Sequence, residues 1–176
     1  MPKALRVAII GTGMVANAAH LPALTHLRKQ GIVDIVGCAD IRESAAAETA
    51  KRYDIPAFFT DPQAMLDSLK PDFVAVTTPN MYHKKWTIAA LRAGANVACE
   101  KPMALNVADA EEMFAVAREC GRLLFPCQCM RWRNYMQTAK YLVDQGELGA
   151  PYFSDIAFIR RWGIPTWGMF HMKEHN

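Results

Sequence analysis

The chain has 176 residues and a formal net charge of +3 at pH 7, with 52% hydrophobic and 21% charged residues. This composition is ordinary for a globular protein with a sizeable core, and the positive charge is too small and too scattered to favour a nucleic acid partner. No apolar run approaches the ~18 residues of a membrane span and the N-terminus lacks a secretory hydrophobic segment, so we expect a cytoplasmic protein with no membrane partner.

The first predicted strand, Leu5–Ile10, runs directly into the pattern Gly-x-Gly-x-x-Ala. Gly11 lets the chain turn tightly out of the strand, and Gly13 lets a pyrophosphate come close to the backbone. Ala16 is small enough for the next helix, predicted over Met14–Gln30, to pack against the strand. The N–H groups that open this helix favour an anion, so the segment predicts a dinucleotide-binding loop.

The second predicted strand, Val33–Asp40, ends in an acidic residue slightly farther from the glycine pattern than the usual ~20 residues. The Asp40 carboxylate can accept hydrogen bonds from the adenosine ribose diol and repels a 2′-phosphate, which favours NAD over NADP. Arg42 keeps NADP open, because a guanidinium beside the ribose can pair with that phosphate. Otherwise Arg42 is an exposed charge in the first turn of the following helix.

Strands and helices continue to alternate up to about Gln128. Further strands are predicted at residues 57–59, 73–77, 96–99 and 123–128, and helices at 43–53, 62–69, 82–93 and 107–120. Asp61 and Asn106 predict helix N-caps, while Pro22 predicts a kink or a division in the first helix. Gly94 and Gly121 predict left-handed C-caps. Apolar strands that alternate with helices indicate a doubly wound parallel sheet of the α/β class, a Rossmann domain.

The five cysteines fit a reducing compartment, because their number is odd and two of them, Cys38 and Cys99, lie on predicted buried strands. The pair Cys127-x-Cys129 resembles half of a metal site. It has no second ligand pair at zinc spacing, and alternate residues on a strand point the same way for packing reasons alone. We therefore expect no metal site.

The alternating pattern breaks after a helix predicted over Asn134–Gln145. The segment Pro151–Trp162 is rich in aromatic and β-branched residues and predicts a strand, but no later segment exists to pair with it. We expect a dinucleotide-binding domain over residues 1–130. Residues 131–176 then form a linking helix and the incomplete beginning of a substrate and oligomerisation domain.

A first polar cluster lies at the predicted carboxyl end of a strand, where open α/β sheets bind their ligands. Thr78, Pro79 and Asn80 can line a ribose or a nicotinamide, and His83 opens the next helix. Taken alone, this segment is also consistent with a simple turn, with Asn80 as an N-cap and His83 in the first helical turn.

A second polar cluster, Glu100-Lys101-Pro102, leaves the end of another apolar strand. If a nicotinamide ring lies above this point, Lys101 can reach the hydroxyl or carbonyl group that exchanges hydride and can transfer its proton. Without that context, the cluster is consistent with a solvated strand end.

Taken together, the segments Gly-x-Gly-x-x-Ala, Thr-Pro-Asn-x-x-His, Glu-Lys-Pro and Cys-Met-Arg-Trp-Arg resemble the glucose–fructose oxidoreductase / inositol dehydrogenase / MocA (Gfo/Idh/MocA) family. The resemblance spans essentially the whole chain. It implies that Lys101 is catalytic and that the Lys101–Pro102 peptide is often cis. The implied cofactor-binding residues are Gly11, Thr12, Gly13, Met14, Val15, Asp40, Arg42, Thr78, Pro79, Asn80, His83, Glu100, Lys101 and Arg131.

The resemblance also implies an activity, namely NAD(P)-dependent hydride transfer to or from a secondary alcohol or ketone of a sugar, cyclitol or related polyol. It implies a homo-oligomeric full-length form whose second catalytic group follows beyond Asn176, so we expect this chain to bind cofactor without turnover. The alternative is a non-catalytic NAD(P)-binding regulator on the same fold. Lys101 weighs against that alternative, because a regulator needs no reactive lysine there.

Overall fold

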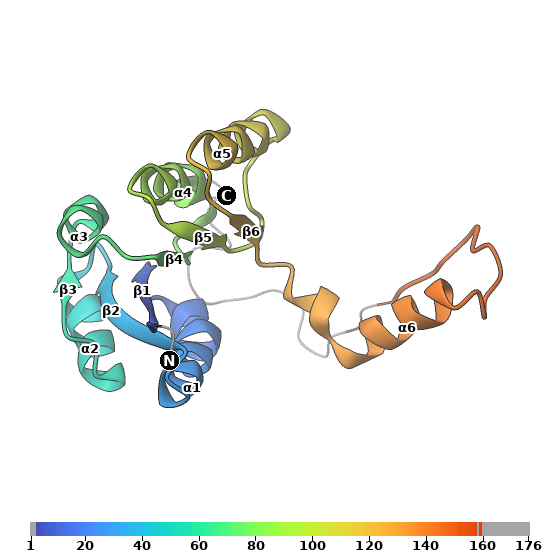
Figure 1. Ribbon diagram of the computed structural model, residues 1–176, viewed down its shortest axis with the longest axis horizontal. Helices are drawn as coiled ribbons and strands as arrows, with labels where there is room; N and C mark the ends of the chain where they lie inside the picture. The colour runs from blue at the N-terminus through green and yellow to red at the C-terminus, as the bar shows by residue number, and fades with distance from the viewer. Residues whose placement is uncertain (1–2, 158, 160–176) are drawn as a thin grey trace. The chain divides into compact units, whose positions relative to one another are not determined.

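The computed structural model describes residues 3–157 and 159, which divide into two compact units, one up to Cys127 and one from Gln128 onward. The first unit is built on a six-stranded sheet in which every pair of neighbours is parallel (Figure 1). Its strands are β1 (Leu5–Ile10), β2 (Val33–Ala39), β3 (Phe58–Phe59), β4 (Phe73–Val76), β5 (Asn96–Cys99) and β6 (Leu124–Pro126).

The strand order is β3-β2-β1-β4-β5-β6, so the direction of winding reverses between β1 and β4. Open α/β sheets bind ligands at such a reversal, beyond the carboxyl ends of the strands. The predicted Rossmann fold is therefore confirmed, and its topology marks where to look for a site.

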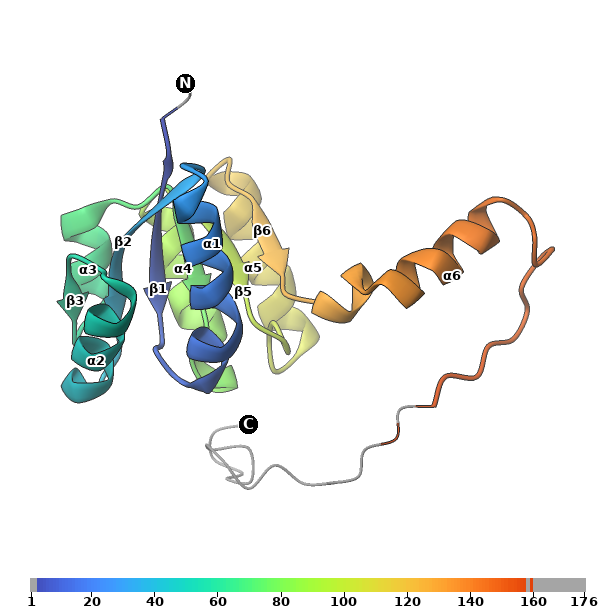
Figure 2. The same cartoon turned by 90° about the horizontal axis from the view of Figure 1, so that it is seen from below.

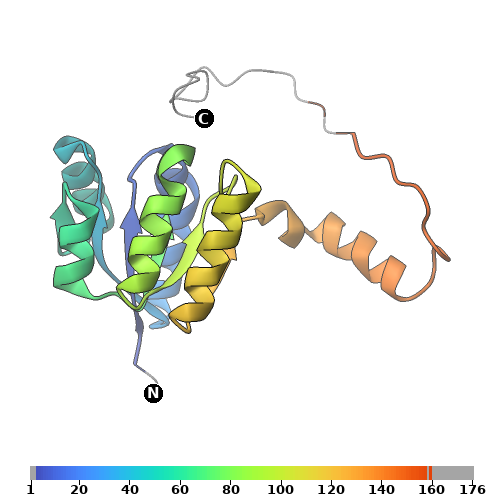
Figure 3. The same cartoon turned by 90° about the horizontal axis from the view of Figure 1, so that it is seen from above.

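Helices cover both faces of the sheet. They are η1 (Ala16–His20), α1 (Leu21–Lys29), α2 (Glu43–Tyr53), α3 (Pro62–Leu69), η2 (Asn80–Tyr82), α4 (His83–Arg92) and α5 (Val107–Glu119). Figure 2 shows α1 and α2 on one face, and Figure 3 shows α3, α4 and α5 on the other. This arrangement follows from right-handed crossovers that wind outward in both directions from β1.

The core lies in two clusters, one beneath each helix layer. Because side chains alternate along a strand, Ile9 packs with the α1 and α2 layer, whereas its neighbour Ile10 packs with the α3, α4 and α5 layer. Cys38 and Cys99 are fully buried, as the sequence predicts, and burial raises the pKa of each thiol to about 11. These two cysteines therefore act as small apolar core residues.

The predicted helix boundaries are largely confirmed. The side chains of Asp61 and Asn106 each accept a hydrogen bond of 2.9 Å from a backbone N–H of the first turn. Gly94 and Gly121 have φ of 90° and 60°, as left-handed C-caps require. The first helix is divided before Leu21 into the π-helical turn η1 and the α-helix α1, consistent with Pro22, which has no N–H to donate.

Two local predictions are wrong. Asn80 is not an N-cap, because it is the first residue of the 3₁₀ helix η2, whose N-cap is Pro79. Residues 151–157 form neither strand nor helix, and among the described residues no segment pairs with them, whereas a strand needs a hydrogen-bonded neighbour. Residues 158 and 160–162 of that predicted strand lie outside the described residues.

The second unit contains the 3₁₀ helix η3 (Cys129–Trp132) and the α-helix α6 (Asn134–Asp144), and no residue of either helix is buried. Assignment of residues 131–176 to a substrate domain stays a prediction. Among the described residues, no helix combines the length and apolarity needed to cross a bilayer.

Candidate dinucleotide-binding site

The loop after β1 is shaped by two glycines that meet different constraints. Gly11 has φ of 93°, and a Cβ there would lie 2.8 Å from the carbonyl carbon and oxygen of Thr77. Only glycine fits this close approach between the ends of β1 and β4. A Cβ on Gly13 would meet nothing within 4 Å, so its backbone faces open space that a pyrophosphate can enter.

Two side chains hold this loop in shape, a role that the sequence interpretation assigned to neither of them. The Thr77 hydroxyl donates to the Gly11 carbonyl at 2.6 Å. From η1, Asn17 Nδ2 donates to the carbonyl oxygens of Thr12 and Gly13 at 2.7 and 3.0 Å. For Asn17, the one feature of the sequence that could have predicted this role is its position one helical turn after Gly13, which places its polar side chain on the side of the helix that faces the loop.

Asp40 follows β2 and fixes the other side of the loop. Its Oδ2 accepts hydrogen bonds from the Thr12 N–H at 2.9 Å and the Thr12 hydroxyl at 3.1 Å, and its Oδ1 accepts one from the Arg42 N–H at 3.0 Å. Burial acts to raise the pKa of Asp40, but these hydrogen bonds and the Arg42 charge hold it below its ordinary value of 3.8. A negative charge is therefore maintained where the adenosine ribose is expected.

Arg42 is the N-cap residue of α2, one position before the first helical turn in which it was expected. Its side chain is 67% exposed, and Nε lies 3.4 Å from Asp40 Oδ1. The guanidinium therefore stands beside the carboxylate, at the edge where a ribose substituent would approach.

The turn after β4 combines a buried hydroxyl with a buried histidine. Among the described residues, Thr78 Oγ1 is buried without a hydrogen-bond partner, and a ligand atom would satisfy it. His83 is only 1% exposed, with Nε2 at 2.8 Å from the Thr78 carbonyl oxygen and Nδ1 at 2.7 Å from that of Pro102. His83 thus joins the two polar clusters through the backbone rather than bordering open space.

The segment after β5 places a carboxylate beside an exposed lysine. Glu100 is half-buried; its Oε1 lies 2.8 Å from His20 Nε2, and its Oε2 accepts a hydrogen bond from the Lys101 N–H at 3.1 Å. Burial acts to raise the pKa of Glu100, but these partners and their charges hold it below 4.5. Lys101 is exposed, and the Lys101–Pro102 peptide is cis, as the family resemblance implies.

Most of the predicted site residues therefore share one edge of the sheet, the lower edge in Figure 2, because they follow the carboxyl ends of β1, β2, β4 and β5. In the glycine loop, Met14 is exposed and Val15 half-buried. Pro79 and Asn80 lie in the turn after β4. Arg131 belongs to η3 of the second unit, so its place in the site stays a prediction.

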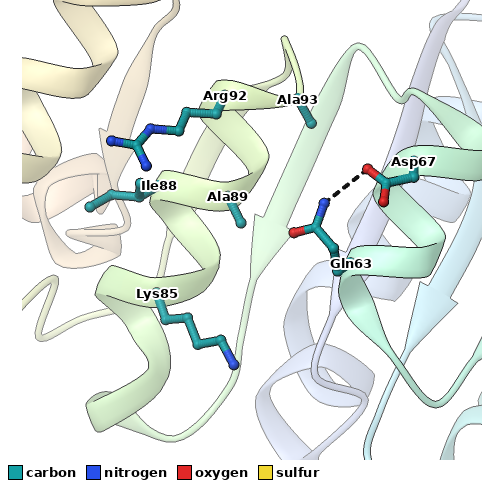
Figure 4. A pocket seen from close by; sticks show the side chains of 7 residues that line it. All are labelled: Gln63, Asp67, Lys85, Ile88, Ala89, Arg92 and Ala93. Carbon is teal, nitrogen blue, oxygen red and sulfur yellow. Dashed lines mark hydrogen bonds between the residues drawn. The ribbon is translucent and has the colours of Figure 1, made fainter.

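One groove lies away from this edge. It has a volume of about 420 Å³ and lies between α3 and α4, where Gln63 donates to Asp67 at 2.9 Å and Lys85 and Arg92 stand opposite (Figure 4). A second groove of about 370 Å³ includes Asn80 among its lining residues. The candidate site is therefore identified by strand ends and polar groups rather than by a deep cavity.

Comparison with known proteins gives a family match over most of the first unit. A family model described as an oxidoreductase family with an NAD-binding Rossmann fold matches residues 5–127. The chain is 39% identical over 170 residues to D-glucoside 3-dehydrogenase of Escherichia coli strain K12, which covers 97% of this chain and 48% of that protein. The chain thus spans about half the length of the curated relatives it matches.

Solved structures give the same result. The myo-inositol 2-dehydrogenase of Lactobacillus plantarum matches with a TM-score of 0.72 and 28% identity, over 84% of this chain and 43% of its own. The WlbA dehydrogenase of Chromobacterium violaceum, solved with NADH and UDP-GlcNAcA, matches with a TM-score of 0.78 and 27% identity, over 85% of this chain and 42% of its own.

Proposed function

This chain belongs to the Gfo/Idh/MocA oxidoreductase family, which has an NAD-binding Rossmann fold. We propose that it provides the cofactor-binding domain of an NAD(H)-dependent dehydrogenase that acts on sugars or cyclitols. The observation that carries the proposal is the convergence of the glycine loop, Asp40, Thr78 and Lys101 at one edge of the sheet. Relatives named for a glucoside and an inositol support the substrate class, a secondary alcohol of a polyol.

The cofactor residues divide the dinucleotide between them. The open backbone at Gly13 and the N–H groups that follow it would bind the pyrophosphate, while the Asp40 carboxylate would accept hydrogen bonds from the adenosine ribose. The unpartnered Thr78 hydroxyl and the Glu100 carboxylate would contact the nicotinamide end. When bound, the nicotinamide supplies the hydride chemistry of the reaction.

Lys101 would handle the proton of the substrate hydroxyl. It is exposed at the carboxyl end of β5, and its backbone is held by Glu100 on one side and by the Pro102 ring on the other. In the oxidation direction its neutral amine would accept the proton of the substrate hydroxyl, and in the reduction direction the ammonium would return a proton to the carbonyl oxygen. His83 would position this segment through the Pro102 carbonyl oxygen.

Cofactor preference tests the binding half of the proposal. We expect NADH to bind more tightly than NADPH, because the Asp40 charge repels a 2′-phosphate. The Kd for NADPH should be at least about tenfold higher, which corresponds to about 1.4 kcal/mol in binding free energy. Calorimetric titration of the purified chain with each cofactor measures the ratio. Tighter binding of NADPH would instead show that Arg42 determines the preference.

Lys101→Ala tests the catalytic half. In the form of the protein that shows turnover, we expect kcat to fall ~10²–10⁴-fold because proton transfer is lost, while the affinity for NADH changes little. Lys51→Ala, an exposed lysine of α2, is the matched control. Unchanged kcat in Lys101→Ala with several polyols would remove Lys101 from the mechanism.

A further inference from the structure

Three side chains from separate elements meet beside the proposed nicotinamide end of the site. They are His20, the last residue of η1, Glu100, which follows β5, and Cys127, which follows β6. Their nitrogen, oxygen and sulfur ligand atoms all lie within 4.8 Å of one another, and each residue is half-buried. The three positions are far apart in the sequence, so no spacing pattern reveals the cluster.

The parallel sheet fixes two of the three positions. β5 and β6 pair so that Cys99 lies opposite Pro126, and the next residues along the two strands are Glu100 and Cys127. The Cys127 N–H donates to the Cys99 carbonyl at 2.8 Å, which continues the ladder to the very end of the strands. Their side chains are therefore presented by ordered backbone at one point of the sheet edge.

The third position is fixed by the helix that follows the glycine loop. His20 Nε2 lies 2.8 Å from Glu100 Oε1, across 80 positions of the sequence. In a tetrahedral zinc site neighbouring ligand atoms are separated by about 3.3–3.6 Å, as Zn–N and Zn–S lengths of about 2.0 and 2.3 Å require. The Cys127 sulfur lies within 4.8 Å of the other two ligand atoms, so a bound Zn²⁺ ion would need this sulfur to approach by at most about 1.5 Å and the imidazole and the carboxylate to separate by about 0.5 Å.

The donor set selects the metal. An imidazole nitrogen, a carboxylate oxygen and a thiolate sulfur together suit Zn²⁺, whereas Mg²⁺ and Ca²⁺ require oxygen ligands throughout. Two anionic ligands match the double positive charge of the ion. Three protein ligands also leave the fourth position of a tetrahedral ion open.

We propose that His20, Glu100 and Cys127 form a Zn²⁺ site that inhibits the dehydrogenase by engaging Glu100. The inhibition rests on the proposed function, because it requires Glu100 to contact the cofactor. Zn²⁺ binding is independent of the proposed function, because it depends only on the positions of the three ligand side chains. The two parts are therefore measured separately.

Metal binding is tested first, on the whole chain without cofactor. We expect calorimetry to detect one Zn²⁺ per chain, and Co²⁺ in its place to show thiolate-to-cobalt charge-transfer absorption. Cys127→Ser and His20→Gln should each weaken Zn²⁺ binding at least about tenfold, and Cys127→Ser should abolish the absorption band. Cys129→Ser and His26→Gln are the matched controls and should bind Zn²⁺ as the wild type does.

Three results would overturn the site: no Zn²⁺ binding, unchanged binding in Cys127→Ser, or an equal loss in Cys129→Ser. Inhibition is tested next, by titrating NADH in the presence and absence of saturating Zn²⁺. We expect Zn²⁺ to weaken NADH binding at least about tenfold, and Cys127→Ser to remove this effect. Equal NADH affinity with and without Zn²⁺ would overturn the inhibition and leave the site standing. Failure of NADH to bind even without metal would instead contradict the proposed function.

Discussion

Two glycines of one loop illustrate how different physical demands select the same residue. Gly11 is required by the fold, because its backbone has positive φ and touches the end of β4. Gly13 faces open space, so nothing in the protein itself excludes a side chain there. The sequence pattern predicts a tight turn at Gly11 and a close pyrophosphate at Gly13; the contacts of Gly11 agree with the first role, and the second stays a prediction.

Substitution by alanine should separate these roles. Gly11→Ala is expected to lower the free energy of unfolding by about 1–3 kcal/mol from backbone strain alone, with a further cost from the contact with Thr77. Gly13→Ala should leave stability within about 0.5 kcal/mol of the wild type and weaken NADH binding at least about tenfold. Urea unfolding and calorimetric titration measure the two effects. A stable Gly11→Ala, or a Gly13→Ala with unchanged affinity, would contradict this assignment.

The ionised carboxyls of Asp40 and Glu100 should make stability depend on pH. Both have folded pKa values held below their ordinary values of 3.8 and 4.5, so both favour the folded state above those values. We expect the free energy of unfolding to fall as the pH drops below about 4.5 and the groups become protonated. Asp40→Asn should be less stable than the wild type at neutral pH and should approach it in acid.

Urea unfolding between about pH 3 and pH 7 checks this expectation. Glu48→Gln, at an exposed position of α2, is the control and should keep the wild-type pH dependence. A constant difference between Asp40→Asn and the wild type at every pH would show that Asp40 acts through packing and not through its charge.

Among the elements, those defined by local signals were predicted well from the sequence. The β1 strand, the α2 and α3 helices and the Asn106 cap were all predicted correctly, because apolar periodicity and capping residues are properties of neighbouring positions. The pairing of His20 with Glu100 could not be predicted, since it depends on where two distant segments meet in space. The strand predicted from residue 151 is absent over residues 151–157 for a related reason. A strand needs a hydrogen-bonded partner, and the composition of a segment does not show whether such a partner is present.

The π-helical turn η1 contributes the Asn17 side chain, which supports the glycine loop. Asn17→Ala would remove both hydrogen bonds that Nδ2 donates to loop carbonyl oxygens, and we expect a loss of about 1–3 kcal/mol in the free energy of unfolding together with weaker NADH binding. Thermal unfolding and titration measure the two quantities. Gln63→Ala, which removes one exposed hydrogen bond on α3, should stay within about 0.5 kcal/mol. Equal losses in the free energy of unfolding for Asn17→Ala and Gln63→Ala would contradict the role of Asn17 in supporting the loop.

For the molecule as a whole, cofactor binding should stabilise one unit selectively. At an NADH concentration of 100 times Kd, the free energy of unfolding should rise by about 2.7 kcal/mol. Hydrogen exchange should show new protection at the sheet edge, in residues 77–80 and 100–102, and little change in α6. Protection at residues 129–132 would support the predicted role of Arg131. Uniform protection over both units would instead contradict a site confined to the strand ends.

The Asp40 carboxylate accepts four hydrogen bonds, and these limit which substitutions could change the cofactor preference of this protein to NADP. Replacing Asp40 to admit a phosphate also removes the acceptor that orders the Thr12 and Arg42 backbone, so specificity and loop architecture would change together. Ile41 and Arg42, which are exposed, are the more permissive starting points. A route to the other coenzyme would therefore begin beside the acidic residue, with loop-stabilising substitutions in place before that residue itself is exchanged.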